Sequence, residues 1–373
     1  MNFQIAKRAF YNALSIASRA TSSNSPIPAL SGIKIEAETS KLILTSSNED
    51  ISIQLTLDAN DENNHLTIFS EGSIVIDSRY LIEIVRKIED DDVKVEIMDG
   101  TLTRISGEYA EFNINGMRGT DYPNIDFRKP NQVIEIDADT LLKTIMQTSF
   151  ATSDKETRPV LTGVNFKSMG SYVECVATDS YRLARKFINL EVPSNFNITI
   201  PAKSLNEVSK IIEHDTMIQL AVDANKAQFY LDNVLIQTRL IDGGYPETNR
   251  LIPTEFKYEL TIDARKILNA MDRAAFIKND GVHVIRLVAK EDDLEISSFS
   301  QEVGSSTENI TASDHVGEGI SISFSGKYVI DAIRSLAANK VTIRFSGEMK
   351  PFLITNPDDD SILQLVLPVR TYN

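Results

Sequence analysis

Cysteine is nearly absent from this chain of 373 residues, which contains only Cys175. A single cysteine cannot form an intrachain disulfide, and this scarcity fits a reducing compartment. Apolar and polar residues alternate over Tyr172–Ala177, so we expect Cys175 to be a buried thiol in a strand rather than a nucleophile. The class of disulfide-stabilised secreted domains is therefore excluded.

Long apolar runs are absent as well. Lys7 and Arg8 interrupt the N-terminal segment that would have to be apolar in a signal peptide. No apolar stretch reaches the roughly 18 residues that indicate a membrane-spanning helix. We therefore expect a soluble, cytoplasmic protein.

Catalytic and metal-binding motifs are also absent from the sequence. The four histidines are scattered, with no partner at motif spacing: His65, His214, His283 and His315. No Gly-x-Ser-x-Gly, Walker, His-Glu-x-x-His or Cys-x-x-Cys motif occurs. The acidic runs 89–92, 291–293 and 358–360 lack the interleaved spacing of a calcium loop and are typical of solvated turns. An enzyme is the main alternative class, and the sequence offers it no catalytic residue, no metal site and no cofactor.

What the chain does have is an internal repeat. Tyr80–Ile88, Ser204–Ile212 and Tyr328–Leu336 each carry apolar residues at helical spacing, and their acids at positions 83, 207 and 331 are 124 residues apart. A short strand that leads into a helix also occurs three times, and these helices end near residues 19, 150 and 278. Such repeats predict three similar structural units.

Strands fill the sequence between these helices. Period-two alternation is clear at 33–36, 51–57, 93–97, 218–222 and 320–324, and turns such as Asp99-Gly100 predict antiparallel hairpins. Each repeat is therefore predicted to be an α+β unit, with two helices packed on antiparallel sheets. Tyr122-Pro123 and Tyr245-Pro246 mark the ends of the first two units, which predicts domains 1–126, 127–253 and 254–373.

The net charge of −15 hides an uneven distribution. The helical stretches 7–19, 79–88, 138–150, 203–212, 264–278 and 327–338 hold 15 lysines and arginines against 5 aspartates and glutamates, so they carry +10 and the rest carries −25. Helix propensity favours glutamate as much as lysine, so propensity alone does not explain this bias. If the helices share one face, that face attracts the DNA backbone without reading bases, while the acidic remainder repels DNA.

With its three similar units spaced by about 124 residues, the sequence resembles the bacterial beta sliding clamps, the processivity subunits (subunit beta) of DNA polymerase III. Ala177–Ala184 is similar to the family motif Ala-Thr-Asp-Gly-His-Arg-Leu-Ala. Tyr245-Pro246 with Arg250–Pro253 is similar to Phe/Tyr-Pro…Arg-Val-Leu-Pro, and Leu367–Arg370 is similar to the Met/Leu-Pro-Met/Val-Arg ending. Arg273-Ala274-Ala275 also fits, and the resemblance covers the whole chain.

The resemblance implies the DNA clamp fold and a function in DNA replication without catalysis. Two copies would join head to tail into a closed ring that encircles double-stranded DNA, irrespective of its sequence. The ring would tether the polymerase, the clamp loader and repair proteins through short peptides. In the homodimer, Phe112 and Ile114 of domain 1 would face Phe276 and Ile277 of domain 3, although core packing is the simpler interpretation of these residues.

The resemblance also implies a pocket between domains 2 and 3 for partner peptides that carry a glutamine and end in leucine or phenylalanine. Apolar walls would bury the peptide and polar groups would orient it. An ordinary hairpin turn is an equally good interpretation of Thr178-Asp179-Ser180. The matching positions are Leu161, Thr178, Ser180, Tyr181, Arg182, Leu183, Pro246, Arg250, Leu251, Val282, Tyr328, Leu365, Val366, Leu367, Pro368, Val369 and Arg370.

For DNA contact, the family positions correspond to Arg79, Arg86, Lys155, Lys203 and Lys210, with Arg158 close by in the sequence. Two positions depart from the family pattern. Asn24 stands where a loop arginine is often found, and Ser180-Tyr181 replaces Gly-His. A repeat scaffold that binds only proteins is a further alternative, against which the basic helices argue.

Overall fold

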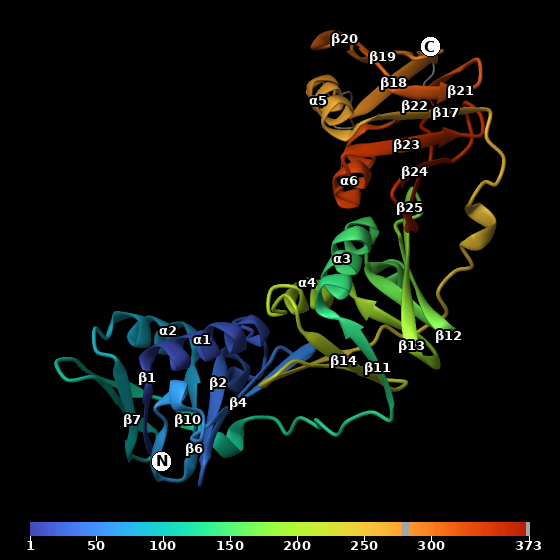
Figure 1. Cartoon of the computed structure of the whole chain (residues 1–373). Helices are drawn as coiled ribbons and strands as arrows, with labels where there is room; N and C mark the ends of the chain where they lie inside the picture. Colours follow the sequence, from blue (N-terminus) through green and yellow to red (C-terminus); the bar gives the residue numbers. More distant parts are fainter. Residues whose placement is uncertain (278–282, 371–373) are drawn as a thin grey trace. The chain divides into compact units, whose positions relative to one another are not determined.

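The computed structural model describes residues 1–277 and 283–370 (Figure 1). By internal contacts the chain divides into two compact units, which are described separately. The first unit comprises Met1–Ala138 with Asn206–Leu240, and the second comprises Asp139–Leu205 with Ile241–Asn373. Among the described residues, no helix is long and apolar enough to cross a membrane.

The six predicted helices are present. Their bounds are α1 Lys7–Ala17, α2 Ser78–Lys87, α3 Ala138–Thr148, α4 Ala202–Val208, α5 Ala264–Ala274 and α6 Gly326–Leu336. The predictions of helices over 203–212 and 264–278 were too long, since α4 ends at Val208 and α5 ends at Ala274. The chain tightens after Val208, where the N–H of Ile211 donates to the carbonyl of Val208 at 3.0 Å instead of continuing the α-helical ladder.

Helix α2 shows why these segments form. Asp77 precedes it and accepts a hydrogen bond from the N–H of Arg79 at 3.1 Å, which caps the helix. Leu81, Ile84 and Val85 are buried, whereas the residues between them point to solvent. Amphipathic spacing therefore decides which face packs on the sheet and which face stays exposed.

The first unit contains two antiparallel sheets. The five-stranded sheet has the order β5-β1-β7-β8-β9, with bounds β1 Asn2–Ala6, β5 Thr67–Ser70, β7 Asp92–Asp99, β8 Leu102–Ser106 and β9 Glu111–Asn115. The nine-stranded sheet has the order β10-β6-β2-β3-β4-β16-β15-β14-β11. Its bounds are β2 Gly32–Glu38, β3 Lys41–Ser47, β4 Ile51–Asp58, β6 Gly72–Asp77, β10 Met117–Arg118, β11 Gln132–Asp137, β14 Met217–Val222, β15 Lys226–Tyr230 and β16 Val234–Arg239. Helices α1 and α2 lie side by side in this unit (Figure 1).

The second unit also contains two antiparallel sheets. The seven-stranded sheet has the order β12-β13-β25-β24-β23-β17-β21. Its bounds are β12 Gly163–Thr178, β13 Arg182–Pro201, β17 Tyr258–Asp263, β21 Asp314–Val316, β23 Lys340–Phe345, β24 Phe352–Asn356 and β25 Asp359–Val366. The four-stranded sheet has the order β20-β19-β18-β22, with bounds β18 Val284–Lys290, β19 Asp293–Ser300, β20 Gly304–Thr311 and β22 Gly319–Ser325. Helices α5 and α6 contribute Ile267, Met271, Val329 and Ile333 to the core of this unit.

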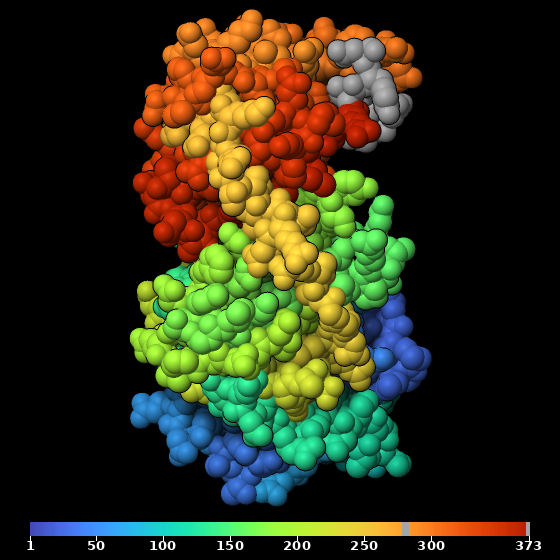
Figure 2. Space-filling model, turned by 90° about the vertical axis from the view of Figure 1, so that its right-hand side faces the viewer, coloured from blue at the N-terminus to red at the C-terminus, as the bar shows by residue number. Residues whose placement is uncertain are grey.

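Strand pairing continues across the repeat boundaries expected at 126 and 253. Strand β4 of the first repeat pairs with β16 of the second, and β13 of the second repeat pairs with β25 of the third. We call these two strand pairs the first seam and the second seam. The expected boundaries themselves fall in extended segments, and Figure 2 shows the segment 241–257, in yellow to gold, running along the surface.

Candidate functional site

A second, smaller apolar cluster lies apart from the main core, at the second seam. Leu183 of β13 is directly opposite Leu365 of β25, which is opposite Leu353 of β24. These three residues and Val176 are buried, and they are flanked by partly exposed Tyr245, Ile252, Phe256, Leu363 and Leu367. Leucine side chains thus form a row across three neighbouring strands on the sheet face that does not belong to the main core.

The corresponding row at the first seam is polar. Ser47 and Ser52 are opposite each other there, Ser52 is opposite Gln237, and Gln237 is opposite Gln228. The serine hydroxyls are 2.8 Å apart, and the Gln228 amide donates to Gln237 at 2.6 Å. Because equivalent positions have polar side chains at one seam and leucines at the other, the fold does not require the leucine row. Leu363 and Leu367 extend this buried row to the surface, so the cluster is a candidate binding surface.

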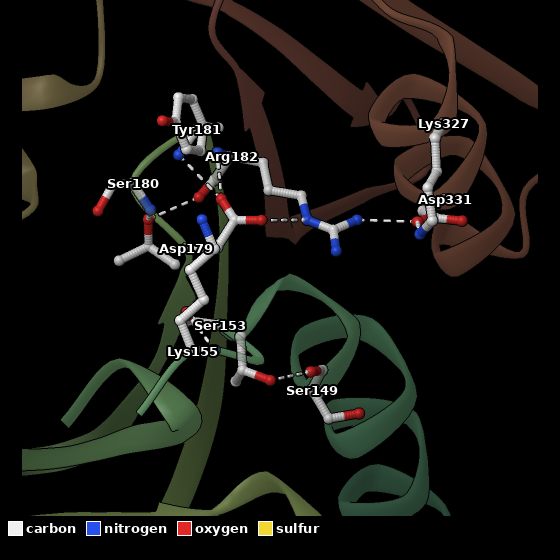
Figure 3. Close-up of polar contacts among 11 residues, drawn as sticks. Ser149, Ser153, Lys155, Asp179, Ser180, Tyr181, Arg182, Lys327 and Asp331 are labelled. Carbon is white, nitrogen blue, oxygen red and sulfur yellow. Dashed lines mark hydrogen bonds and ion pairs between the residues drawn. The ribbon is translucent and has the colours of Figure 1, made fainter. Parts of the chain in front are cut away.

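Arg182 precedes Leu183 on β13, and its side chain points to the other face of the sheet, toward helix α6 (Figure 3). Its Nε donates to Oδ2 of Asp179 at 3.0 Å, and its Nη1 donates to Oδ2 of Asp331 at 2.8 Å. The guanidinium also lies over the rings of Tyr328 and Phe150, with its carbon 4.6 and 5.2 Å from the ring centroids. Arg182 is only 9% exposed, so two carboxylates and two aromatic faces replace the water that its charge has lost.

The turn before Arg182 is closed by its own side chains. Asp179 Oδ1 accepts from the N–H groups of Tyr181 and Arg182 at 2.8 and 3.0 Å, and Thr178 Oγ1 accepts from Ser180 N–H at 3.1 Å. Ser180 has φ +78°, in the left-handed region that glycine favours. The interpretation of this segment as a hairpin turn is therefore confirmed, and Ser180 occupies the position where the family motif has glycine. Tyr181 is exposed beside it.

The C-terminal segment lies beside this turn. The N–H of Leu367 donates to the carbonyl of Tyr181 at 2.9 Å, and the N–H of Val369 donates to that of Ser323 at 2.7 Å. Pro368 forms an isolated bridge with Phe324, and Arg370 is exposed.

The structure places the predicted pocket residues unevenly. Thr178, Arg182, Leu183, Leu365 and Leu367 gather at the second seam, and Tyr328 stacks on Arg182. The side chain of Val366 lies in the main core, on the opposite face from Leu365. Leu161 is buried, whereas Pro246, Arg250 and Leu251 lie in the exposed segment 241–257. Val282 lies outside the described residues.

Sequence reasoning missed several members of the apolar cluster: Val176, Ile252, Leu353, Phe256 and Leu363. The available signal was that both faces of the segment 361–367 are apolar. That pattern alone is typical of any buried strand, so it did not identify a binding surface.

The predicted DNA contacts are exposed cations on the helices and their adjoining loops. Arg79, Arg86 and Lys210 belong to the first unit, and Lys155, Arg158 and Lys203 belong to the second. Arg86 pairs with Glu83 at 2.6 Å, Lys210 pairs with Glu207 at 2.6 Å, and the hydrogen bond from Arg79 to Asp77 raises the pKa of Arg79. Asn24 is exposed in its loop.

Of the predicted dimer contacts, Phe112 and Ile114 lie on an unpaired sheet edge, and Phe276 and Ile277 lie just after α5. In the described part of the chain, β9 ends the five-stranded sheet and β20 ends the four-stranded sheet. Phe112 and Ile114 of β9 are half-buried, and Phe276, just after α5, is 82% exposed, with Ile277 half-buried beside it. Open edges with apolar side chains are where another chain can add a strand.

The described residues contain no cluster of histidine, cysteine, aspartate and glutamate that could hold a metal ion. Cys175 is fully buried, and burial raises the pKa of its thiol, which makes it a poor nucleophile. In the part of the chain that the structure describes, exposed cations and a partly exposed apolar cluster are therefore the candidate binding surfaces.

Comparison with known proteins gives matches along the whole chain. Family models of the DNA polymerase III beta subunit match residues 1–126 (N-terminal domain), 135–247 (central domain) and 249–370 (C-terminal domain). The beta sliding clamp of Bacillus subtilis (strain 168) is 40% identical over 378 residues, with 100% of both chains covered.

Solved structures give the same result. The crystal structure of the DNA polymerase sliding clamp from Bacillus subtilis matches with a TM-score of 0.96 and 40% identity, covering 100% of both chains. The beta chain of DNA polymerase III from Streptococcus pneumoniae matches with a TM-score of 0.95 and 33% identity, covering 99% of this chain and 100% of that one.

Proposed function

Because the chain belongs to the DNA polymerase III beta subunit family, the bacterial beta sliding clamps, we propose that two copies close head to tail into a ring around duplex DNA. The protein acts as a processivity subunit in DNA replication and does no chemistry of its own. We assign domains 1–126, 127–253 and 254–373 as the three units that each protomer contributes to the ring. We also place the protein in the cytoplasm, where bacterial DNA is replicated.

The pairing at the two seams is the observation that carries ring closure. Ile236 of β16 is opposite Ile53 of β4, and Gln364 of β25 is opposite Ala184 of β13. The ladders within each repeat make Ile236 equivalent to Gln364, and Ile53 equivalent to Ala184. Both seams therefore join the last strand of one repeat to the same strand of the preceding repeat, in the same register.

A third seam of this kind needs a second copy of the chain. The strand equivalent to β16 and β25 is β9 in the first repeat, and the strand equivalent to β4 and β13 is β20 in the third. Both strands are sheet edges in the described chain. Pairing β9 of one protomer with β20 of its partner repeats the internal seams and closes the ring, as a heterologous contact with the right rotation does.

The register of the internal seams fixes the register of this contact. Phe112 would lie opposite Ser306 of the partner subunit, and Asn113 would lie opposite Ser305 of the partner subunit. The burial of the free edges agrees with this register. Phe112 and Ile114 are half-buried and alternate with exposed residues on β9, as do Ser306 and Glu308 on β20. Phe276 and Ile277, at the end of α5, would cover the apolar side of the contact.

Partner proteins would bind at the leucine row of the second seam. A peptide with a leucine or phenylalanine end can bury that side chain against partly exposed Leu363 and Leu367, beside the buried Leu183 and Leu365. Exposed Tyr181 and Arg250 would contact its polar parts. Polymerase, clamp loader and repair proteins would share this pocket. DNA would contact the exposed cations of the helices, which bind phosphates without reading bases.

A disulfide between protomers tests the proposed register. In the variant Asn113→Cys/Ser305→Cys, oxidation should give a covalent dimer, since directly opposite strand residues are close enough for a disulfide. The buried Cys175 does not compete. The control Asn113→Cys/Thr307→Cys is shifted by one pair along the same face and should cross-link poorly. Equal cross-linking of both variants, or none of either, would overturn the proposed closure.

A further inference from the structure

Six cations occupy equivalent positions on the second helix of each repeat or, for Lys210, directly after it. Arg79, Lys203 and Lys327 stand in the first turns of α2, α4 and α6, and all three are exposed. Arg86, Lys210 and Arg334 stand one to two turns further along, and all three follow the acids spaced by 124 residues. Repeat equivalence alone assigns the same role to the members of each set.

Their ion pairs differ. Arg79 bonds Asp77 at 3.3 Å, and Lys327 bonds Asp331 at 2.7 Å. At the later positions, the partners are Glu83 for Arg86 at 2.6 Å, Glu207 for Lys210 at 2.6 Å and Asp272 for Arg334 at 3.3 Å. Of these six cations, all of which the structure describes, only Lys203 has no carboxylate partner.

The sequence explains why Lys203 is unpaired. Asp77 directly precedes α2 in the first repeat, and Pro201 directly precedes α4 in the second. The two residues occupy equivalent positions in their strand ladders. Proline offers no carboxylate to the first turn of α4. The other acid that could serve, Glu207, is equivalent to Asp331 but binds Lys210 and, at 3.3 Å, Arg19.

Pairing changes how strongly a cation attracts phosphate. An exposed ion pair is weak, so a phosphate can compete for the cation. The carboxylate nevertheless stays within a few ångströms and repels the same phosphate, so the pair acts on DNA almost as a neutral group. An unpaired lysine keeps its full charge and releases a counterion when it binds.

We infer that Lys203 is the strongest phosphate contact among these six positions, and that Asp77, Glu83, Glu207, Asp272 and Asp331 weaken the other five. The inference rests on the proposed function as a DNA-encircling ring. It also gives the helix acids a role, because a ring that slides needs phosphate contacts that are weak and easily exchanged. The acids then set how tightly the ring holds the DNA backbone.

Salt titration of DNA binding tests the inference with matched variants. The full-length dimer is titrated onto a fluorescent duplex oligonucleotide at several salt concentrations, and affinity is followed by anisotropy. Lys203→Gln should lower the slope of log affinity against log salt by about one unit per copy that touches DNA. Arg79→Gln and Lys327→Gln should each change the slope by less than half as much. Lys203→Arg should retain the wild-type slope, and unchanged melting temperatures should show that every variant folds.

A gain-of-function variant provides the second arm. Asp77→Asn keeps a side-chain oxygen that can cap α2, yet removes the charge beside Arg79. It should increase affinity for DNA several-fold at low salt, and Asp77→Asn/Arg79→Gln should lose that gain. Equal losses for Lys203→Gln and Arg79→Gln, or no gain for Asp77→Asn, would overturn the inference while the wild type still binds. Failure of the wild-type dimer itself to bind DNA would overturn the proposed function.

Discussion

The guanidinium of Arg182 donates to the Asp331 carboxylate across 2.8 Å and so joins a β-turn of the second repeat to helix α6 of the third. The side chain of Arg182 lies on the face of the sheet opposite to the one that carries Leu183 and Leu365. One buried contact therefore holds two repeats together at the second seam.

Removing Arg182 should destabilise the second seam. Arg182→Met should lower the free energy of unfolding by about 3 kcal/mol, since it leaves Asp179 and Asp331 without their buried cation. Urea denaturation followed by circular dichroism measures this change. Lys327→Met removes the exposed partner of the same Asp331 and should cost less than about 1 kcal/mol. Similar costs for both variants would contradict the role given to Arg182.

Leu367 should be needed for peptide binding. Leu367→Ser should weaken the binding of a partner peptide at least about tenfold, because it removes a partly exposed leucine from the proposed pocket. Arg239 is the residue at the polar first seam that is equivalent to Leu367 at the second seam. The control Arg239→Ser should leave peptide affinity unchanged. Calorimetric titration of both variants with one peptide decides the matter.

Ser180 should be less stable in its turn than glycine would be. A non-glycine residue in the left-handed region destabilises the folded state by roughly 1–2 kcal/mol. Glycine avoids this strain, but it loses more conformational entropy on folding, which offsets part of the gain. Ser180→Gly should therefore raise stability by about 0.5–1 kcal/mol and raise the melting temperature. Gly170 has φ +79° and open space around its Cβ position, so Gly170→Ser should destabilise by a similar amount. An effect of the same sign in both variants would show that backbone strain is not the cause.

Asp359 should contribute a pH-dependent part of stability. Burial alone would raise the pKa of its carboxyl, but hydrogen bonds from Ser361 and Lys186 and the charge of Lys186 lower that pKa to about 2. Because the folded-state pKa lies below the unfolded value of 3.8, the contribution is present above about pH 4 and is lost as pH falls toward 2. Asp359→Asn should therefore destabilise the protein at pH 6 and approach the wild type near pH 2. A difference that does not change with pH would contradict this assignment.

Local patterns in the sequence predicted the elements, and long-range pairing decided the site. Helical spacing identified the six helices, and period-two alternation identified the strands given by range above. Both signals depend only on residues that are close together in the sequence. They did not reveal that α4 ends at Val208, or that β13 pairs with β25 across a repeat boundary. The leucine row exists only through that pairing. Leu183, Leu365 and Leu353 are far apart in the chain, so only the family resemblance indicated part of the pocket.

The sequence also could not predict which cations form ion pairs. Counting residues indicated that the helices are basic, and this was enough to favour DNA as a partner. The count could not distinguish Lys203 from Arg79, since that difference depends on which side chain stands beside each cation. Sequence reasoning thus identified the kind of surface and left the contribution of each residue to the structure.

The central claim is topological, and retention on closed DNA tests it most directly. The protein is loaded with a clamp loader and ATP onto a nicked circular plasmid, and the bound fraction is measured by gel filtration before and after a single cut linearises the DNA. A ring that encircles DNA should stay bound to the circle and slide off the linear form. Equal retention on both forms, or dissociation from both, would contradict the account.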